Sequence, residues 1–333
     1  MRHPCCHRTL PAMAALLPLL LSCTGVPDFA EPHLIDRPRV LSLVAEPPEI
    51  APGQSATLSI LTAGGAPGRA RFRVCGGFFA IVGSRQFDEG ESGGAESGQG
   101  CGAEGGLELG EGAEVELPAA LSAALFGDLE LAAAVLGSVL PPETVELIRS
   151  QVGLPLLVEA RIETDGGVLR AIKRVLVSEN PRPHHNPPPP HFDFGDLEIE
   201  TDAATPFHCR AVSGEPVRAR AGERIEIAPI VAGDGEDWLE SYRIIDARGE
   251  LSERQERAFY GYFVSAGRLD EGLTEAPLRN DRWRLPAEPG CEQLWMVLRD
   301  GHGGQSACQL DVEVIDVDAD GSGGRACGAG ANF

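Results

Sequence analysis

The C-terminal stretch DVDADGSGG is the one local pattern in this sequence that could bind an ion by itself. Three aspartates alternate along it, Asp316, Asp318 and Asp320, and a glycine follows. Alternate carboxylates can point at one calcium ion, and the glycine permits the turn. The twelfth position of such a loop should supply a bidentate glutamate, but here it is Cys327. We therefore keep the three aspartates as candidate metal ligands and expect a solvated acidic tail.

Three histidines, His184, His185 and His191, cluster in the stretch NPRPHHNPPPPHFDF. Imidazole is a common metal ligand. Four consecutive prolines, however, predict an extended polyproline II spacer, and a stiff spacer without carboxylate support cannot close around an ion. We therefore expect no metal there. The acidic stretch DGEDWLE, residues 234–240, is interpreted in the same way, as a solvated segment.

Cysteines form a second group with possible chemistry. Six of them lie downstream of Cys23, and an even number predicts disulfides if the chain is exported, which the N-terminal residues described next indicate. None has the C-x-x-C spacing of a zinc site. Cys75 and Cys101 flank one loop and are expected to pair. If GHGG is a hairpin turn, Cys308 and Cys291 lie about 20 Å apart. We therefore favour Cys209 paired with Cys308 or with Cys291.

An apolar run, residues 10–21, ends at Ser22 and Cys23. As a helix it would span about 18 Å, which is short of the roughly 30 Å hydrocarbon core of a membrane. With Arg2 and Arg8 before it, the run predicts a signal peptide that is removed from the mature chain.

The end of that run, LLSC, resembles the lipobox of bacterial lipoproteins, in which the cysteine receives the lipid. The resemblance implies lipidation of Cys23, a membrane partner through this anchor, and a place in the cell envelope. Thr24 after the cysteine favours the outer membrane, by analogy with enterobacterial sorting. The alternative is a secreted chain that is cut a few residues later.

The net charge of the chain is −22 at pH 7. So acidic a surface repels phosphate backbones, which argues against a nucleic-acid partner.

The pattern of the chain predicts a mainly β protein with two immunoglobulin-like antiparallel β-sandwich domains, the first with a helical insertion. Short alternating runs such as ATLSIL, bounded by Pro/Gly turns, indicate strands. Between residues 118 and 151, apolar residues recur three and four positions apart, which indicates two helices. Residues 84–112 are rich in Gly, Glu and Ser, which indicates a solvated loop. The expected segments are a signal peptide (1–22), a flexible tether (23–38), a first domain (39–178), a Pro/His-rich spacer (179–195), a second domain (196–316) and a flexible tail (317–333).

Two passages resemble a known family. RVLSLVAEPPEIAPGQSATLSILTA is similar to the N-terminal strand pair of exported lipoproteins of myxobacteria. YFVSAGRL, WRLPAEPG and LWMVLRDGHGG resemble the terminal half of their immunoglobulin-like or PKD-like domains. The resemblance implies a fold and a compartment and leaves the activity open.

Two functions from different classes follow. The sequence contains no GxSxG, HExxH, P-loop or dinucleotide fingerprint. The expected division of the chain into a tether, two sandwich domains and the spacer between them also leaves no segment for a separate catalytic domain. We therefore expect a noncatalytic envelope lipoprotein without a cofactor, which binds a protein or glycan or serves as a structural module. The alternative is a hydrolase, or an accessory subunit of an envelope enzyme, whose site no linear motif reveals.

The tail gives a first prediction. Without a twelfth ligand, nothing closes the far side of the calcium shell, so titration of the protein with calcium should give no saturable heat from this loop. Calorimetry checks this. A saturable heat that disappears when Asp316, Asp318 and Asp320 are together changed to asparagine would contradict it.

Overall fold

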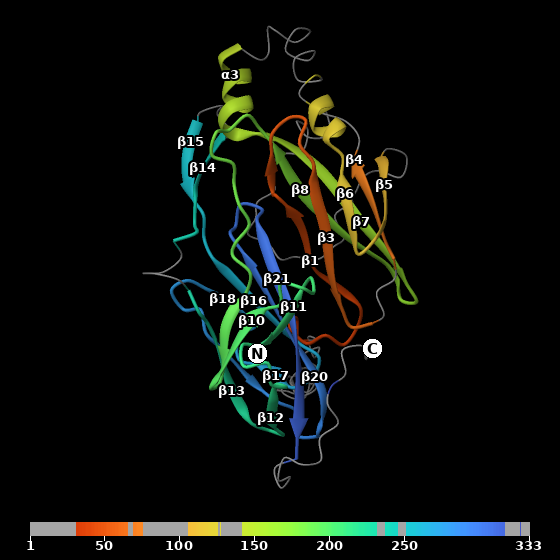
Figure 1. The fold of residues 1–333 in the computed structure, drawn as a ribbon, viewed down its shortest axis with the longest axis vertical. Helices are drawn as coiled ribbons and strands as arrows, with labels where there is room; N and C mark the ends of the chain where they lie inside the picture. The colour runs from red at the N-terminus through yellow and green to blue at the C-terminus, as the bar shows by residue number, and fades with distance from the viewer. Residues whose placement is uncertain are drawn as a thin grey trace, which may run out of the picture. The chain divides into compact units, whose positions relative to one another are not determined.

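The computed structural model describes residues 31–65, 69–75, 106–125, 127, 142–231, 237–245, 251–316 and 327. The fold is mainly β, as expected, and the described residues from His33 onward belong to one compact unit. Within this unit two mainly antiparallel, immunoglobulin-like β-sandwich domains follow one another along the chain (Figure 1). The calcium-loop residues Asp318 and Asp320, the lipidation site Cys23 and the expected disulfide partner Cys101 lie outside the described residues.

The first domain packs a three-stranded sheet against a five-stranded sheet. The small sheet has the order β1-β3-β6, and the larger one β2-β8-β7-β4-β5. The strands are β1 (Arg39–Glu46), β2 (Glu49–Ile50), β3 (Ala56–Ala63), β4 (Ala70–Cys75), β5 (Gly106–Gly112), β6 (Glu114–Leu117), β7 (Leu154–Thr164) and β8 (Gly167–Val177). Alternation explains the core: Leu58 and Ile60 of β3 are buried among Phe72 and Val158 of the opposite sheet, while Ser59 between them is half-buried.

The helical insertion is small in the described residues. Residues 119–125 are helical, and α3 (Pro142–Leu147) continues into the π-helical turn η2 (Ile148–Val152). This turn ends at Gly153, whose φ of 77° suits glycine. Ser122 fixes the first helical segment, since its hydroxyl donates to the Gln54 carbonyl at 2.8 Å.

Part of the expected acidic loop is a strand, so the prediction for residues 84–112 is wrong at its C-terminal end. β5 pairs with β4 along Ala70–Cys75 although few of its side chains are buried. Backbone hydrogen bonds do not need apolar side chains, and the cross-strand ion pair of Arg71 with Glu111, 2.8 Å, supports the pairing.

The second domain is built on one continuous hydrogen-bonded path of strands. The order is β17-β19-β13-β9-β10-β11-β21-β20-β16-β18, with β12 also on β21 and a separate ribbon, β14-β15. The strands are β9 (His191–Phe194), β10 (Leu197–Thr201), β11 (His208–Ala211), β12 (Arg218–Arg220), β13 (Arg224–Pro229), β14 (Ser241–Ile245), β15 (Leu251–Gln255), β16 (Phe259–Val264), β17 (Arg268–Leu269), β18 (Leu273–Glu275), β19 (Asp281–Arg284), β20 (Gly290–Arg299) and β21 (Gln305–Ile315). Aromatic side chains fill its core, among them Phe192, Tyr260, Tyr262 and Trp283.

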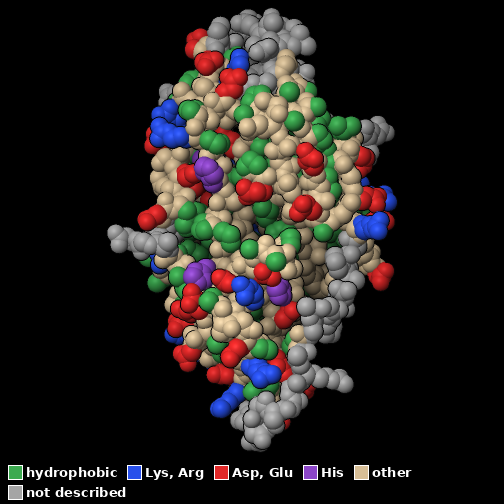
Figure 2. All heavy atoms as spheres, in the orientation of Figure 1, with side chains coloured by type: hydrophobic (Ala, Val, Ile, Leu, Met, Phe, Trp, Pro, Cys, Tyr) green, Lys and Arg blue, Asp and Glu red, His purple; other side chains and the backbone are tan. Residues whose placement is uncertain are grey.

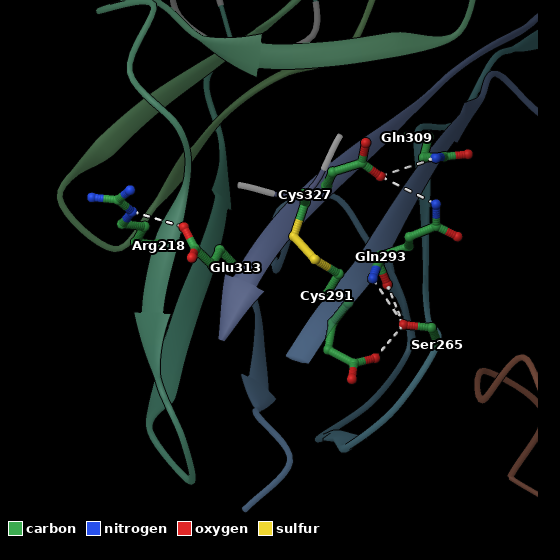
Figure 3. The surroundings of a disulfide bond; sticks show 9 residues. Arg218, Ser265, Cys291, Gln293, Gln309, Glu313 and Cys327 are labelled. Atoms are coloured by element: carbon green, nitrogen blue, oxygen red, sulfur yellow. Dashed lines mark hydrogen bonds and ion pairs between the residues drawn. A yellow bond between two sulfur atoms is a disulfide. The ribbon is translucent and has the colours of Figure 1, made fainter. Parts of the chain in front are cut away.

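Two disulfides brace the last hairpin, β20–β21. Cys209 pairs with Cys308, which is one of the two alternatives considered above. Cys291 lies opposite Glu313 in the hairpin, whereas Cys308 lies opposite Met296, so these two cysteines are too far apart to bond. Cys291 instead pairs with Cys327, and Figure 3 shows this bond beside the start of β20. Cys75 is disulfide-bonded as well.

Two expected domain boundaries need correction. Strand β9 lies inside the expected spacer 179–195 and pairs with β10 and β13, because its alternating HFDF pattern buries Phe192 and Phe194. The end of the expected tether 23–38 is also ordered. The amide of Ile35 donates to the Val264 carbonyl at 2.8 Å, and Ile35 is buried, so an apolar side chain and an open strand edge hold this segment.

The two sandwiches share a third apolar cluster. Leu41, Leu61 and Ala63 of β1 and β3 lie in it together with three residues of the last hairpin, Trp295, Val297 and Ala307. Polar contacts border it: Ser42 Oγ donates to Gln305 Oε1 at 2.8 Å, and Arg299 Nη2 donates to the Leu41 carbonyl at 3.0 Å. The domains are therefore packed together, contrary to the expectation of two units held apart by a stiff spacer.

This packing predicts cooperative unfolding. Leu61→Ala removes buried apolar volume from the shared cluster and should lower the free energy of unfolding by about 2–5 kcal/mol, while the protein still unfolds in one transition. The matched control is Leu278→Ala, because Leu278 is 81% exposed and its loss should change little. Differential scanning calorimetry checks both. Two separate transitions in the unchanged protein, with only one shifted by Leu61→Ala, would contradict the packing.

Candidate metal centre

The linker between β8 and β9 is held at several points. The side chain of Asn186 donates to the Ala45 carbonyl at 2.7 Å and accepts from the Gln305 amide at 3.0 Å. Farther along, Ser306 Oγ donates to the Pro188 carbonyl at 2.7 Å. Prolines have no amide to donate, so a proline-rich segment is held through its carbonyls and its polar neighbours. The linker thus contacts both domains and holds His184 in a defined position.

Two carboxylates approach His184 from the base of the β14–β15 ribbon. Ser241 pairs with Gln255 in that ribbon, so the next residues outward, Glu240 and Glu256, also lie opposite each other. The Glu240 amide donates to Glu256 Oε2 at 2.8 Å, and the Glu256 amide to the Glu240 carbonyl at 3.0 Å. The ribbon therefore brings together two carboxylates that are 16 residues apart in sequence.

The distances in this cluster are short. His184 Nδ1 lies 2.9 Å from Glu240 Oε2 and 3.3 Å from Glu256 Oε1. The other Glu240 oxygen lies 2.9 Å from His185 Nδ1. From the first domain, Glu49 Oε2 accepts the His184 amide at 2.7 Å and lies 3.9 Å from His184 Nε2. Four segments of the chain meet at one imidazole ring.

The cluster is shielded from solvent and rich in negative charge. The His184 side chain is 11% exposed, and Glu49 and Glu256 are buried. Burial alone would lower the pKa of His184, but the carboxylates of Glu256, Glu49 and Glu240 outweigh it and raise the pKa. Within the cluster, Glu256 Oε1 is a buried oxygen without a hydrogen bond.

Aromatic rings border the cluster. The His302 ring lies 4.4 Å from the His184 ring and stacks on Tyr242 at 3.7 Å, both measured between centroids. Burial, together with the positive charges of His184 and Arg174, lowers the pKa of His302 to about 2. His302 is therefore neutral at physiological pH.

The turn DGHGG presents His302 to the cluster. Asp300 Oδ1 accepts the amides of His302, Gly303 and Gly304 at 2.7, 2.8 and 2.9 Å. A Cβ atom at Gly304 would collide with this carboxylate, which explains the glycine. Burial, followed by the charge of Glu256, raises the pKa of Asp300 to about 6.

The first domain contacts this turn with two cations of β8. The Lys173 ammonium donates to the Gly303 carbonyl, and Arg174 Nη2 donates to the His302 carbonyl at 2.8 Å. Burial, with help from Arg174 and Arg299, lowers the pKa of Lys173 to about 8 although Asp300 and Glu46 oppose the change. A charged lysine in this position is therefore costly at neutral pH.

The sequence interpretation of the histidines has to be corrected. Its premise, a spacer without carboxylate support, is wrong, because Glu240 and Glu256 reach His184 from the second domain. Glu240 belongs to the acidic stretch that was interpreted as solvated, while Glu256 and Glu49 stand in no motif. His191 lies apart, with Nε2 2.8 Å from Glu198, and the side chains of both residues are exposed. Of the three aspartates, Asp316 is described and follows directly after β21.

Comparisons with known proteins identify no family. No protein-family model matches the chain, and no curated protein sequence matches it. Solved structures with some likeness include a chimeric titin Z1Z2 carrying a decorin peptide (9% identity, 84% of this chain and 98% of that one, TM-score 0.20). The D0-D1 domain of intimin has 10% identity over 83% of this chain and 99% of that one, with a TM-score of 0.19. Alpha-2-macroglobulin of E. coli has 11% identity over 85% of this chain and 17% of that one, with a TM-score of 0.20. These scores are too low to support an argument, so the fold assignment rests on the strand pairing described above.

The buried lysine gives a prediction about pH. Between pH 8 and 10.5 the folded protein has released the Lys173 proton while the unfolded chain still holds it, so stability should rise with pH in that window. Relative to Lys173→Met, the free energy of unfolding of the unchanged protein should rise by about 2 kcal/mol from pH 7 to 10. Urea unfolding of both proteins checks this. If the difference in the free energy of unfolding between the two proteins stays constant from pH 7 to 10, the burial of Lys173 is contradicted.

Proposed function

We propose that this chain is a noncatalytic module of the cell envelope, exported and lipid-anchored, which binds a protein or glycan partner or serves as a structural element. The observation that carries the proposal is the shared apolar cluster between the two sandwiches. A module of this kind has to hold its surfaces in a fixed relation, and packing between two domains provides that rigidity.

The placement of the reactive side chains supports a noncatalytic role. His184, Glu256 and Glu49, which could act as acids or bases, contact one another in a shielded position between the linker, the ribbon and the DGHGG turn. A general acid or base has to reach its substrate within hydrogen-bond distance. In this cluster the same groups fasten the linker instead.

The surface charge fits an envelope protein that recognises its partner by shape. On the face drawn in Figure 2, acidic side chains are scattered among basic and neutral ones.

A groove of about 660 Å³ lies between the domains, lined by Ile60 and Leu61 on one side and by Phe207 and His208 on the other. Its mixed polar and apolar lining suits a peptide or a sugar ring.

The lipid anchor is proposed from the N-terminal sequence. Among the described residues, no helix has both the length and the apolar character needed to cross a membrane. The apolar run that ends at Cys23, together with the lipobox-like LLSC, supports attachment through a lipid on that cysteine. Thr24 after the cysteine favours the outer membrane.

Labelling tests this proposal. In a bacterial host, a palmitate analogue should label the protein, and Cys23→Ser should abolish the label and release the protein from the membrane fraction. Cys5→Ser is the matched control, since Cys5 precedes the apolar run and should leave with the signal. Label that persists in Cys23→Ser would overturn the anchor.

A further inference from the structure

We propose that His184, Glu240 and Glu256 bind one divalent transition-metal ion of the zinc class. This site is distinct from the three aspartates of the tail, and it does not depend on the lipid anchor or on the partner of the module.

The geometry of the three ligand atoms fits such an ion. In a tetrahedral site with bonds of about 2.0–2.1 Å, neighbouring ligand atoms are about 3.3 Å apart. His184 Nδ1 lies 2.9 Å from the Glu240 oxygen and 3.3 Å from the Glu256 oxygen, and all three atoms lie within 4.8 Å of one another. Small side-chain movements would complete the triangle around one ion.

An independent observation points to a cation here. Glu256 is only 3% exposed. In the part of the chain that the structure describes, its Oε1 accepts no hydrogen bond and has the His184 ring as its ion-pair neighbour, whereas Oε2 accepts a hydrogen bond from the Glu240 amide. A buried carboxylate oxygen that lacks a partner raises the free energy of the folded state. This oxygen lies 3.3 Å from His184 Nδ1, and a metal ion between the two atoms would coordinate both of them.

The surrounding groups are arranged as in known metal sites. Glu49 Oε2 lies 3.9 Å from the other ring nitrogen of His184, Nε2. This is beyond hydrogen-bond distance, but a small movement of the carboxylate would let it accept the Nε2 proton and leave the Nδ1 lone pair for the ion. His185 holds the second oxygen of Glu240 at 2.9 Å. Such outer contacts fix the tautomer and orientation of the ligands.

The donor set selects the class of ion. Calcium and magnesium prefer shells made of oxygen, whereas one imidazole nitrogen with two carboxylates suits zinc and its neighbours in the first transition row. Two carboxylates and a neutral imidazole also balance the charge of a divalent cation. Water would complete the tetrahedron. The ion would fasten the linker to the β14–β15 ribbon.

Zinc titration of the full chain, freed of metal by a chelator, tests the proposal. We expect about one zinc per chain after dialysis, with a rise in the unfolding temperature of several degrees at saturating metal. His184→Ala and Glu256→Gln should each weaken binding at least about tenfold. His191→Ala is the matched control, because His191 is an exposed histidine of the same stretch and should leave binding unchanged. Zinc binding that survives both ligand variants would overturn the proposal.

A second measurement avoids variants that fail to fold. Cobalt(II) added to the unchanged protein should produce the visible absorption of a four-coordinate site with nitrogen and oxygen ligands, and zinc should remove it. The spectrum of octahedral, hydrated cobalt, with no zinc bound after dialysis, would overturn the site. Calcium at the same concentration should not displace the cobalt, which separates this site from the tail.

Discussion

The burial of one face of β1 and β3 together with Trp295 and its neighbours is the constraint on which the rest of the structure depends. Strands buried on one face normally expose the other, yet Leu41 and Leu61 are buried in a cluster separate from the core of their own domain. Once the two sandwiches share this cluster, the linker that joins them has no room to act as a free spacer. Its polar side chains are forced against both domains.

The polar cluster around His184 is a consequence of that packing. Charged groups taken out of water destabilise a fold unless they are paired, and the chain pairs them across long separations. Glu49 lies 135 residues from the histidine whose amide it accepts, and Lys173 lies 130 residues from the carbonyl that it contacts. Glu256 Oε1 is one of the buried oxygens that accept no hydrogen bond among the described residues, and it lies beside His184 at the point where a metal ion would complete the arrangement.

Local patterns allowed much of the fold to be predicted. The alternation of ATLSILTA predicts β3, and the GHGG turn predicts the hairpin β20–β21 and with it the separation of Cys291 from Cys308. Segments stabilised by distant contacts could not be predicted. β5 has little apolar alternation and is held by its pairing with β4. Ile35 is ordered because its side chain is buried and because the Val264 end of β16, beyond the pairing of β16 with β18, accepts its amide. The candidate site escaped prediction for the same reason, because Glu240 and Glu256 meet His184 only after the domains have packed.

The central claim is that the linker is an integral part of a single folded unit, and native-state hydrogen exchange tests it most directly. The amides of His184 and Gln305 donate to the side chains of Glu49 and Asn186, which belong to other segments. These amides should exchange only through the same global opening that releases the amides of β3 and of the middle of β21, residues 308–314, with equal free energies of opening. Fast exchange at His184 and Gln305 while β3 and β21 remain protected would contradict the claim, because the linker would then open independently of the two domains.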